Sequence, residues 1–243
     1  MDFRQEIFDF VESNSIEQTE LIGNEIRIPK EDVRFKIKSI TKEQDNVQNS
    51  GRIIWEDQWA KKRSIVESRI LSVLGKSKRI YGRDTVIRKL IQPETNSFLK
   101  ENHLIGTTSA KTKLGLVHKD KIMAIATFSK PTKMNRGGIV FRSYEMIRYC
   151  TLNGFTVVGG LSKLINHFIK LEKPDDIMTS VDREWSEGKS FEKLGFKMIE
   201  VTPPREFYLD PVGMERYRTA QEAPPNSISI KNGGNYKFIL FLK

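Results

Sequence analysis

A glycine pair between an apolar run and an amphipathic run is the feature that most constrains how this chain can fold. Residues 157–164 (VVGGLSKL) have the pattern of a strand end, a glycine turn and a helix start. The unpaired N–H groups and the dipole of such a helix start favour an anion, and glycine lets a phosphate approach the backbone closely. A simple strand-to-helix connection with a solvated lysine is the alternative. The predicted phosphate-binding residues are Val158, Gly159, Gly160, Leu161, Ser162 and Lys163.

Length and composition exclude several classes of protein. The chain has 243 residues, enough for one large or two small domains. Its single cysteine, Cys150, excludes an internal disulfide framework and favours a reducing compartment. With three histidines and no zinc-ligand spacing, no metal site is expected. No run of eighteen apolar residues is present, so a cytoplasmic protein without membrane contact is expected.

The formal charge of +10 is unevenly distributed. Residues 1–50 hold eleven acidic and seven basic side chains, whereas residues 60–90 hold ten basic side chains against two acidic ones. Such a concentration of positive charge attracts a polyanion by counterion release, although a solvated basic helix face would have the same composition. The nucleic-acid-binding candidates are Lys61, Lys62, Arg63, Arg69, Lys78, Arg79, Arg83 and, as a base-stacking side chain, Trp185.

Hydrophobic periodicity predicts the elements along the chain. Helices are expected at 3–13, 56–74, 92–102, 161–171 and 186–194. Strands are expected at 25–29, 34–40, 52–55, 85–90, 113–118, 122–129, 142–150, 176–181, 197–201, 207–208 and 236–242. The polar stretch 41–51 is predicted to be a loop, and a domain boundary is placed at 75–83.

Several ordered motifs over about 160 residues resemble the GNAT-like domain of bacteriophage proteins related to the Mom DNA-modification proteins. They are residues 98–106, 114–116, 145–150, 157–164 and 180–188, with 190–196 (SFEKLGF) following. The resemblance implies an α+β fold over residues 81–243, with a GNAT-like central mixed sheet and flanking helices. It also implies acetyl-CoA or another acyl-CoA as cofactor, and a phage-encoded protein in the cytoplasm of a bacterial host.

The same resemblance suggests where the acceptor chemistry would lie. Asp182 and Arg183 end a predicted strand, Asn102 and His103 end the first helix of the domain, and Arg148 lies on the central strand. A carboxylate or an imidazole could take a proton from an amine, and an arginine could bind phosphate. The alternatives are structural: a surface ion pair or turn cap for Asp182 and Arg183, a helix-end contact for His103, and a core or rim position for Trp185.

One departure from the GNAT pattern affects the chemistry. Many GNAT enzymes have a tyrosine where this chain has Phe191, and that tyrosine protonates the leaving thiolate. Phenylalanine cannot donate a proton. Another group, or solvent, would have to supply it, or the domain transfers nothing.

The N-terminal part resembles the Vsr-like homing endonucleases that often precede this domain in phage proteins. The matching residues are 5–11, 24–29, 53–59 and 65–70. The family has an acidic metal ligand near the position of Arg27, and histidines that residues 30–52 lack. We therefore interpret residues 1–80 as a degenerate remnant of a small α/β, restriction-endonuclease-like fold, which could still hold nucleic acid through its basic helix.

Four functions remain open from the sequence. The first is acyl transfer from acyl-CoA to an amine on nucleic acid, with DNA favoured over RNA as the partner. The second is a catalytically inactive, homing-endonuclease-derived DNA-binding or regulatory protein. The third is an active endonuclease that uses Glu6, Glu25, Glu56 and Asp57. The fourth, acetylation of a small molecule or a protein, leaves the basic segment unexplained.

Overall fold

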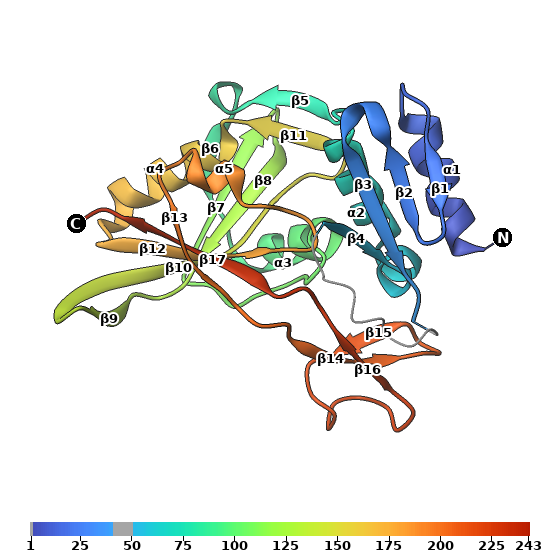
Figure 1. The fold of residues 1–243 in the computed structure, drawn as a ribbon. Helices are drawn as coiled ribbons and strands as arrows, with labels where there is room; N and C mark the ends of the chain where they lie inside the picture. Colours follow the sequence, from blue (N-terminus) through green and yellow to red (C-terminus); the bar gives the residue numbers. More distant parts are fainter. Residues whose placement is uncertain (1, 41–50) are drawn as a thin grey trace. The chain divides into compact units, whose positions relative to one another are not determined.

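The computed structural model describes residues 2–40 and 51–243, and Figure 1 labels its helices and strands. The chain divides into two compact units. Unit 1 contains Met1–Lys76, Val181–Glu187 and Val201–Tyr236. Unit 2 contains Ser77–Ser180, Gly188–Glu200 and Lys237–Lys243. The domain prediction assigned everything after residue 80 to one domain, whereas two of these later segments cluster with the N-terminal part. Most of the loop predicted at 41–51 lies outside the described residues.

Unit 1 has a four-stranded sheet in the order β1-β2-β3-β4, with two helices. The strands β1 to β3 are antiparallel neighbours, and β3 pairs with β4 in parallel. Alternation of apolar and polar residues places Ile26, Ile28 and Phe35 in the core, as expected for a half-buried sheet. The elements are α1 (Phe3–Asn14), β1 (Glu20–Ile22), β2 (Glu25–Ile28), β3 (Val33–Lys38), β4 (Arg52–Trp55) and α2 (Glu56–Val73).

The later part of unit 1 forms a small antiparallel sheet in the order β15-β14-β16. Leu209 on β14 and Ile230 on β16 pack into one buried cluster with Ile53 and Trp55 of β4. Burying this large apolar surface is the physical reason that the segment belongs to unit 1. The strands are β14 (Glu206–Asp210), β15 (Glu215–Tyr217) and β16 (Ile228–Lys231).

Unit 2 is built on a mixed sheet in the order β13-β17-β12-β10-β8-β7-β6, with β9 paired to β10 beside this path. The strands β6, β7, β8 and β10 are antiparallel neighbours, whereas β10 and β12 are parallel. The predicted α+β class with a central mixed sheet and flanking helices is confirmed. The strands are β6 (Val86–Lys89), β7 (Thr112–His118), β8 (Lys121–Phe128), β9 (Thr132–Arg136), β10 (Ile139–Thr151), β12 (Asp176–Asp182), β13 (Lys197–Val201) and β17 (Asn235–Phe241).

Two helices cover opposite faces of this sheet. Phe168 of α4 (Gly160–Glu172) stacks on Phe128 of β8 at 3.7 Å between ring centroids. Phe98 of α3 (Gln92–Asn102) packs in a cluster with Ile125 of the same strand. Residues 125 and 128 point to opposite sides of a strand, so the two helices lie on opposite faces.

A separate ribbon of two parallel strands, β5 (Lys78–Tyr81) and β11 (Phe155–Val158), belongs to unit 2. A short 3-10 helix at Gly82–Asp84 follows β5. Among the described residues, no helix is long and apolar enough to cross a membrane.

The helix predicted at 186–194 is wrong over most of its length. The structure contains only α5 (Lys189–Glu192). Gly188 has φ +80° and lies against the ring of Phe238, while Gly195 has φ +86° just after the helix. Both glycines occupy the left-handed region, which interrupts a right-handed helix, and the periodicity of the apolar residues did not reveal this.

Candidate functional site

The two parallel strands at the centre of unit 2 are paired over a short stretch. β10 pairs with β12 from Ser143 to Met146, and the Thr179 hydroxyl donates to the Met146 carbonyl at 3.0 Å. The register between β10 and β8 shifts between Met146 and Arg148, which makes Ile147 the extra residue of a β-bulge. A bulge leaves one backbone N–H outside the hydrogen-bond ladder of the two strands and changes the direction in which it points. The bulge therefore coincides with the point at which the pairing of β10 with β12 ends.

The predicted phosphate turn starts an uncapped helix. Gly159, with φ +73°, is the N-cap of α4, no side chain caps the helix, and its first turn holds no acidic residue. The first N–H groups of the helix, at residues 160–162, have no partner within the helix. A Cβ added at Gly159 would meet nothing within 4 Å, so the space on that side is open. The turn thus offers donors and a positive dipole end to an anion.

The opposite side of the turn is tightly packed. A Cβ at Gly160 would lie 2.7 Å from Cγ1 of Val157 and 2.9 Å from Cδ1 of Leu116. A Cβ at Gly82 would lie 3.2 Å from the carbonyl carbon of Gly159. Gly82 was not predicted to support the turn, and its only sequence signal is that a glycine directly follows Ile80 and Tyr81. This close packing holds the turn in place within unit 2.

Lys163 contacts the backbone of the protein, and its phosphate-binding role stays a prediction. Its ammonium donates to the carbonyl of Gly82 at 2.8 Å and also to the carbonyl of Thr85. The Thr85 hydroxyl bonds the same Gly82 carbonyl at 2.6 Å. Lys163 therefore satisfies the carbonyls of the 3-10 helix after β5 and helps to keep Gly82 against the turn.

The predicted catalytic residues of α3 make structural contacts. Asn102 is buried, and its side-chain oxygen accepts from the N–H of Asn153 at 2.7 Å, in the turn between β10 and β11. His103 is the C-cap of α3, and its Nδ1 accepts from the N–H of Ile105 at 3.2 Å. Arg148 donates to the carbonyl of Ile147 at 2.9 Å. These contacts do not test a catalytic role, which stays a prediction for all three.

Asp182 and Arg183 belong to unit 1, after the parallel pairing has ended. Asp182 accepts from the N–H of Glu184 at 3.0 Å, and its carbonyl accepts from Trp185 and Ser186, as in a turn cap. Arg183 donates to the carbonyl of Gly233 at 3.0 Å. The turn-cap alternative therefore describes the contacts of Asp182, and its catalytic role stays a prediction.

A buried carboxyl beside these residues was missed. Glu184 is 2% exposed and accepts from the Trp55 indole at 3.0 Å and from the Gly233 N–H at 2.8 Å. Burial, with the charge of Asp182 nearby, raises the pKa of Glu184 to about 7. Burial also lowers the pKa of Lys38, whose ammonium lies 4.8 Å from the Trp55 ring centroid. Glu184 stands among Arg183, Trp185 and Ser186 in the sequence, and this local pattern does not indicate that its side chain is buried.

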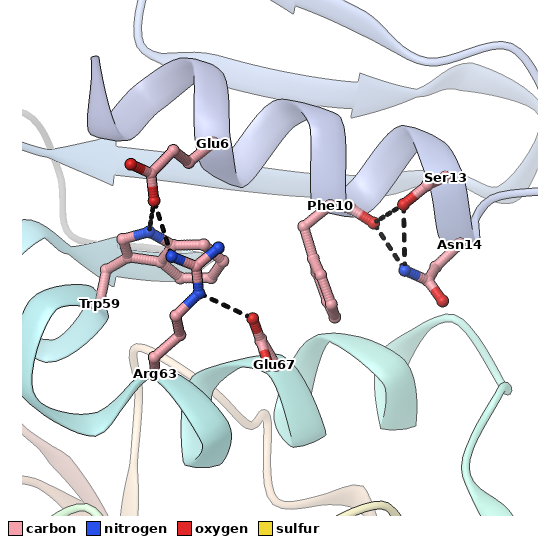
Figure 2. Close-up of polar contacts among 7 residues, drawn as sticks. All are labelled: Glu6, Phe10, Ser13, Asn14, Trp59, Arg63 and Glu67. Carbon is pink, nitrogen blue, oxygen red and sulfur yellow. Dashed lines mark hydrogen bonds and ion pairs between the residues drawn. The ribbon is translucent and has the colours of Figure 1, made fainter. Parts of the chain in front are cut away.

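The basic helix of unit 1 uses part of its charge internally (Figure 2). Arg63 pairs with Glu6 of α1 at 2.8 Å and with Glu67 at 2.9 Å, and it lies 4.6 Å from the Trp59 ring centroid. Glu6 also accepts from the Trp59 indole at 3.2 Å, as the dashed lines of Figure 2 show. Arg63 is thereby partly neutralised.

The other nucleic-acid-binding candidates divide between the units. Lys61 and Lys62 lie on α2, where Lys62 has a non-helical φ of −130°, and Arg69 lies 5.1 Å from the Trp185 ring centroid. In unit 2, the residues Lys78 and Arg79 of β5 and the following Arg83 are exposed. The single basic stretch of the sequence therefore does not form one surface within one unit.

The four carboxylates considered for a nuclease have other partners. Glu6 bonds Trp59 and Arg63, Glu25 pairs with Arg27 at 2.6 Å, Glu56 accepts from the Ser39 hydroxyl at 2.7 Å, and Asp57 pairs with Arg216 at 2.6 Å. Among residues 2–40 and 51–243, no three histidine, cysteine or acidic side chains are grouped for a metal. The contacts give the nuclease hypothesis no support.

Phe191 lies in an aromatic cluster of unit 2. Its ring is 5.5 Å from that of Phe196 and 5.9 Å from that of Phe238, between centroids. The side chain that stands where many GNAT enzymes have a tyrosine is thus part of the packing next to β17.

No protein-family model and no curated protein matches the chain. Solved structures similar to it include the ribosomal-protein-S18-alanine N-acetyltransferase of Escherichia coli, with 13% identity, a TM-score of 0.44, and coverage of 65% of this chain and 94% of that one. A Bacillus subtilis acetyltransferase in complex with CoA has 12% identity and a TM-score of 0.41, covering 65% and 99%. A GNAT family acetyltransferase from Elizabethkingia anophelis with acetyl-CoA bound has 12% identity and a TM-score of 0.40, covering 65% and 99%. These values describe a likeness of fold.

Proposed function

We propose that this chain is an acyl-CoA-dependent N-acyltransferase of the GNAT type whose acceptor is an amine on nucleic acid. One observation carries the proposal: in unit 2, the pairing of β10 with β12 ends at a β-bulge, and the same unit presents a glycine turn before an uncapped helix. Backbone donors are thus available both for an anion and for a reacting carbonyl. The phage origin, the relation to Mom proteins and the Vsr-like remnant stay predictions.

The residues of the turn fit the diphosphate of an acyl-CoA. The N–H groups at 160–162 would donate to its oxygens, and Gly159 leaves the open side on which it would lie. When bound, acyl-CoA supplies an activated thioester carbonyl. No side-chain charge is needed from Lys163, since its ammonium already bonds two carbonyls.

The bulge supplies the second element of the mechanism. The N–H of Ile147 would donate to the carbonyl oxygen on which negative charge develops when an amine attacks. A preorganised donor of this kind contributes roughly a hundredfold to a thousandfold in rate in other enzymes. The amine loses a proton in the same reaction, and the predicted acceptors for that proton are the Asp182 carboxylate and the His103 imidazole.

The leaving thiolate needs a proton that Phe191 cannot supply. The ring packs against Phe196 and Phe238, so solvent or another group must protonate the thiolate in an active enzyme. This aromatic packing is also the observation that favours the second hypothesis, a GNAT-like fold retained for nucleic-acid binding without transfer.

The test uses Ser162, the third residue of α4. Ser162→Asp adds a negative charge where it stabilises a helix N-terminus but repels a diphosphate. We expect isothermal titration to show acetyl-CoA binding to the wild type, at least tenfold weaker binding to Ser162→Asp, and an unchanged or higher Tm. Ser162→Ala is the matched control and should bind nearly as the wild type does.

Gly160→Glu would be a poorer test because any Cβ at this position contacts Val157 and Leu116. Mass spectrometry of nucleosides from expressing cells then tests the acceptor, with an acylated base as the expected product. If folded wild-type protein binds no acetyl-CoA but binds DNA, the second hypothesis replaces the first.

A further inference from the structure

We propose that a basic depression on unit 2 holds an unpaired nucleotide of a single-stranded nucleic acid. The inference rests on the proposed function and locates the part of the chain that holds the acceptor strand. The depression has a volume of about 400 Å³, within the range of small-ligand sites. The residues that line it and carry the argument are Arg79, His118, Lys119, Lys121, Met123 and Phe155.

Two adjacent pieces of unit 2 form the depression. Lys78 and Arg79 of β5 pair with Phe155 and Thr156 of β11 in parallel register. The hairpin of β7 and β8 turns at Lys119 and Asp120, which both have positive φ, so the tip is a tight two-residue turn. The turn places lysines at positions 119 and 121, one on each side of Asp120.

The cations of the depression have no carboxylate partner in the described part of the chain. Arg79, Lys119 and Lys121 are exposed and take part in none of the ion pairs formed by those residues. The nearest acidic residues in the sequence are Asp120, in the turn itself, and Asp84, whose carboxylate lies 3.9 Å from Arg83. Three cations without internal partners attract a phosphate backbone, because binding releases its condensed counterions.

His118 has a defined orientation at the edge of the depression. Its Nδ1 lies 2.7 Å from the carbonyl oxygen of Asp84, so Nδ1 carries a hydrogen and donates it. This hydrogen bond fixes the orientation of the imidazole ring at the edge of the depression.

The apolar floor distinguishes this depression from a purely electrostatic patch. Met123 is buried, and the half-buried ring of Phe155, with the Lys78 ammonium 5.9 Å from its centroid, lines the same depression. An aromatic face binds an exposed base by stacking, whereas the bases of a duplex are already stacked on one another. The combination therefore fits a single strand better than a duplex, and it fits a nucleotide better than an acidic peptide, which has no base to stack.

The ribbon also connects the depression to the glycine turn. Phe155 begins β11 and Gly159 follows its end, four residues later. At about 3.3 Å per residue, the two points lie roughly 13 Å apart along the strand. A strand held in the depression would therefore pass near the proposed acyl-CoA site of the same unit.

Fluorescence anisotropy with a labelled oligothymidylate tests the proposal on the full chain. We expect the double variant Lys119→Glu/Lys121→Glu to weaken binding at least tenfold and to reduce the slope of log K against log salt by roughly 1.4. Lys130→Glu/Lys197→Glu, an equal charge change at two exposed lysines that do not line the depression, should change binding less than threefold. Phe155→Leu should weaken binding about fivefold or more through lost stacking.

Calorimetry with acetyl-CoA on the same variants separates this proposal from the proposed function. Unchanged acetyl-CoA binding, together with weaker oligothymidylate binding, supports the depression as a nucleic-acid site. Equal losses in both lysine pairs would reduce it to a net-charge effect and overturn it. Loss of acetyl-CoA binding in the Lys119→Glu/Lys121→Glu variant would instead assign the depression to the nucleotide end of the cofactor. Competition by polyglutamate, or equally strong binding of a duplex, would also refute the proposed single-strand site. If the wild type binds the oligonucleotide but no acetyl-CoA, the proposed function fails while this inference stands.

Discussion

The α1–α2 contact of unit 1 and the depression of unit 2 contain the same kinds of side chain but use them differently. Arg63 of α2 pairs with two glutamates and lies over Trp59, so its charge is matched within the protein. In unit 2, Arg79, Lys119 and Lys121 surround a partly apolar floor and have no such carboxylate partners among the described residues. A basic residue with a carboxylate partner thus supports the fold, whereas one without such a partner can bind an anionic ligand. We expect changes in unit 1 to affect stability, and changes in unit 2 to affect binding.

The largest stability effect is expected at the ion pair between Asp57 and Arg216. Both side chains are mostly buried and are joined by two hydrogen bonds, at 2.6 and 2.7 Å. Asp57→Ala leaves the Arg216 charge buried without a partner, which should lower the free energy of unfolding by about 3–5 kcal/mol. Urea denaturation measures the change. A loss below about 1 kcal/mol would show that solvent reaches Arg216 and would weaken the comparison.

Glu184 should make the stability of the protein depend on pH. Its folded-state pKa of about 7 lies above the ordinary value of 4.5, so this contribution is fully present below pH 4.5 and is lost as the pH rises to about 7. The gap between the two pKa values corresponds to about 3 kcal/mol. Glu184→Gln should remove this dependence, although the amide cannot replace both acceptor oxygens and should be less stable than the wild type at pH 4.5.

The measurement is urea denaturation of both proteins between pH 4.5 and 8. The charges of Asp182 and Arg216 act on the pKa of Glu184, the charge of Glu184 acts on Lys38, and all three of these groups remain in the variant. Parallel curves for the two proteins would mean that Glu184 does not change its protonation on folding.

Gly82 should couple stability to binding in unit 2. Gly82→Ala places a Cβ 3.2 Å from the Gly159 carbonyl carbon and 3.3 Å from the Gly160 nitrogen, which should cost about 1–3 kcal/mol and displace the turn. Acetyl-CoA binding should weaken in parallel. Gly106→Ala is the control for backbone strain alone. Gly106 has φ +76°, and a Cβ there would meet nothing within 4 Å. Unchanged cofactor affinity in Gly82→Ala would show that the turn does not depend on this packing.

The smallest effect is expected at Arg63. Its side chain is 51% exposed, so each ion pair contributes at most about 1 kcal/mol, and Arg63→Ala should lower stability only slightly. Oligonucleotide binding should also stay within twofold of the wild type, whereas Arg79→Ala should weaken it severalfold. Anisotropy on the two single variants compares one arginine from each unit. A larger binding loss for Arg63→Ala would contradict the division of roles.

Local patterns predicted those parts of the structure whose partners are near in sequence. The helix at 92–102 was predicted at its observed bounds, and Pro93 lies at the helix start, where proline is favoured. The hairpin around Lys119 and Asp120 was predicted because two apolar runs are separated by a short polar turn. The β-bulge at Ile147 and the left-handed Gly188 were not predictable, because a register shift and a single backbone torsion leave no periodic trace.

The sequence by itself determined that an apolar run ends in a glycine pair before a helix, and that positive charge concentrates between residues 60 and 90. The first property depends on residue type and spacing, which govern local backbone geometry. The second is a matter of which residue types occur in that segment. Only the tertiary structure decided that Arg63 is neutralised, that Lys163 bonds carbonyls, and that Glu184 is buried beside Trp55. These outcomes depend on contacts between residues tens to more than a hundred positions apart, and burial changes the free energy of a charge far more than its neighbours in sequence do.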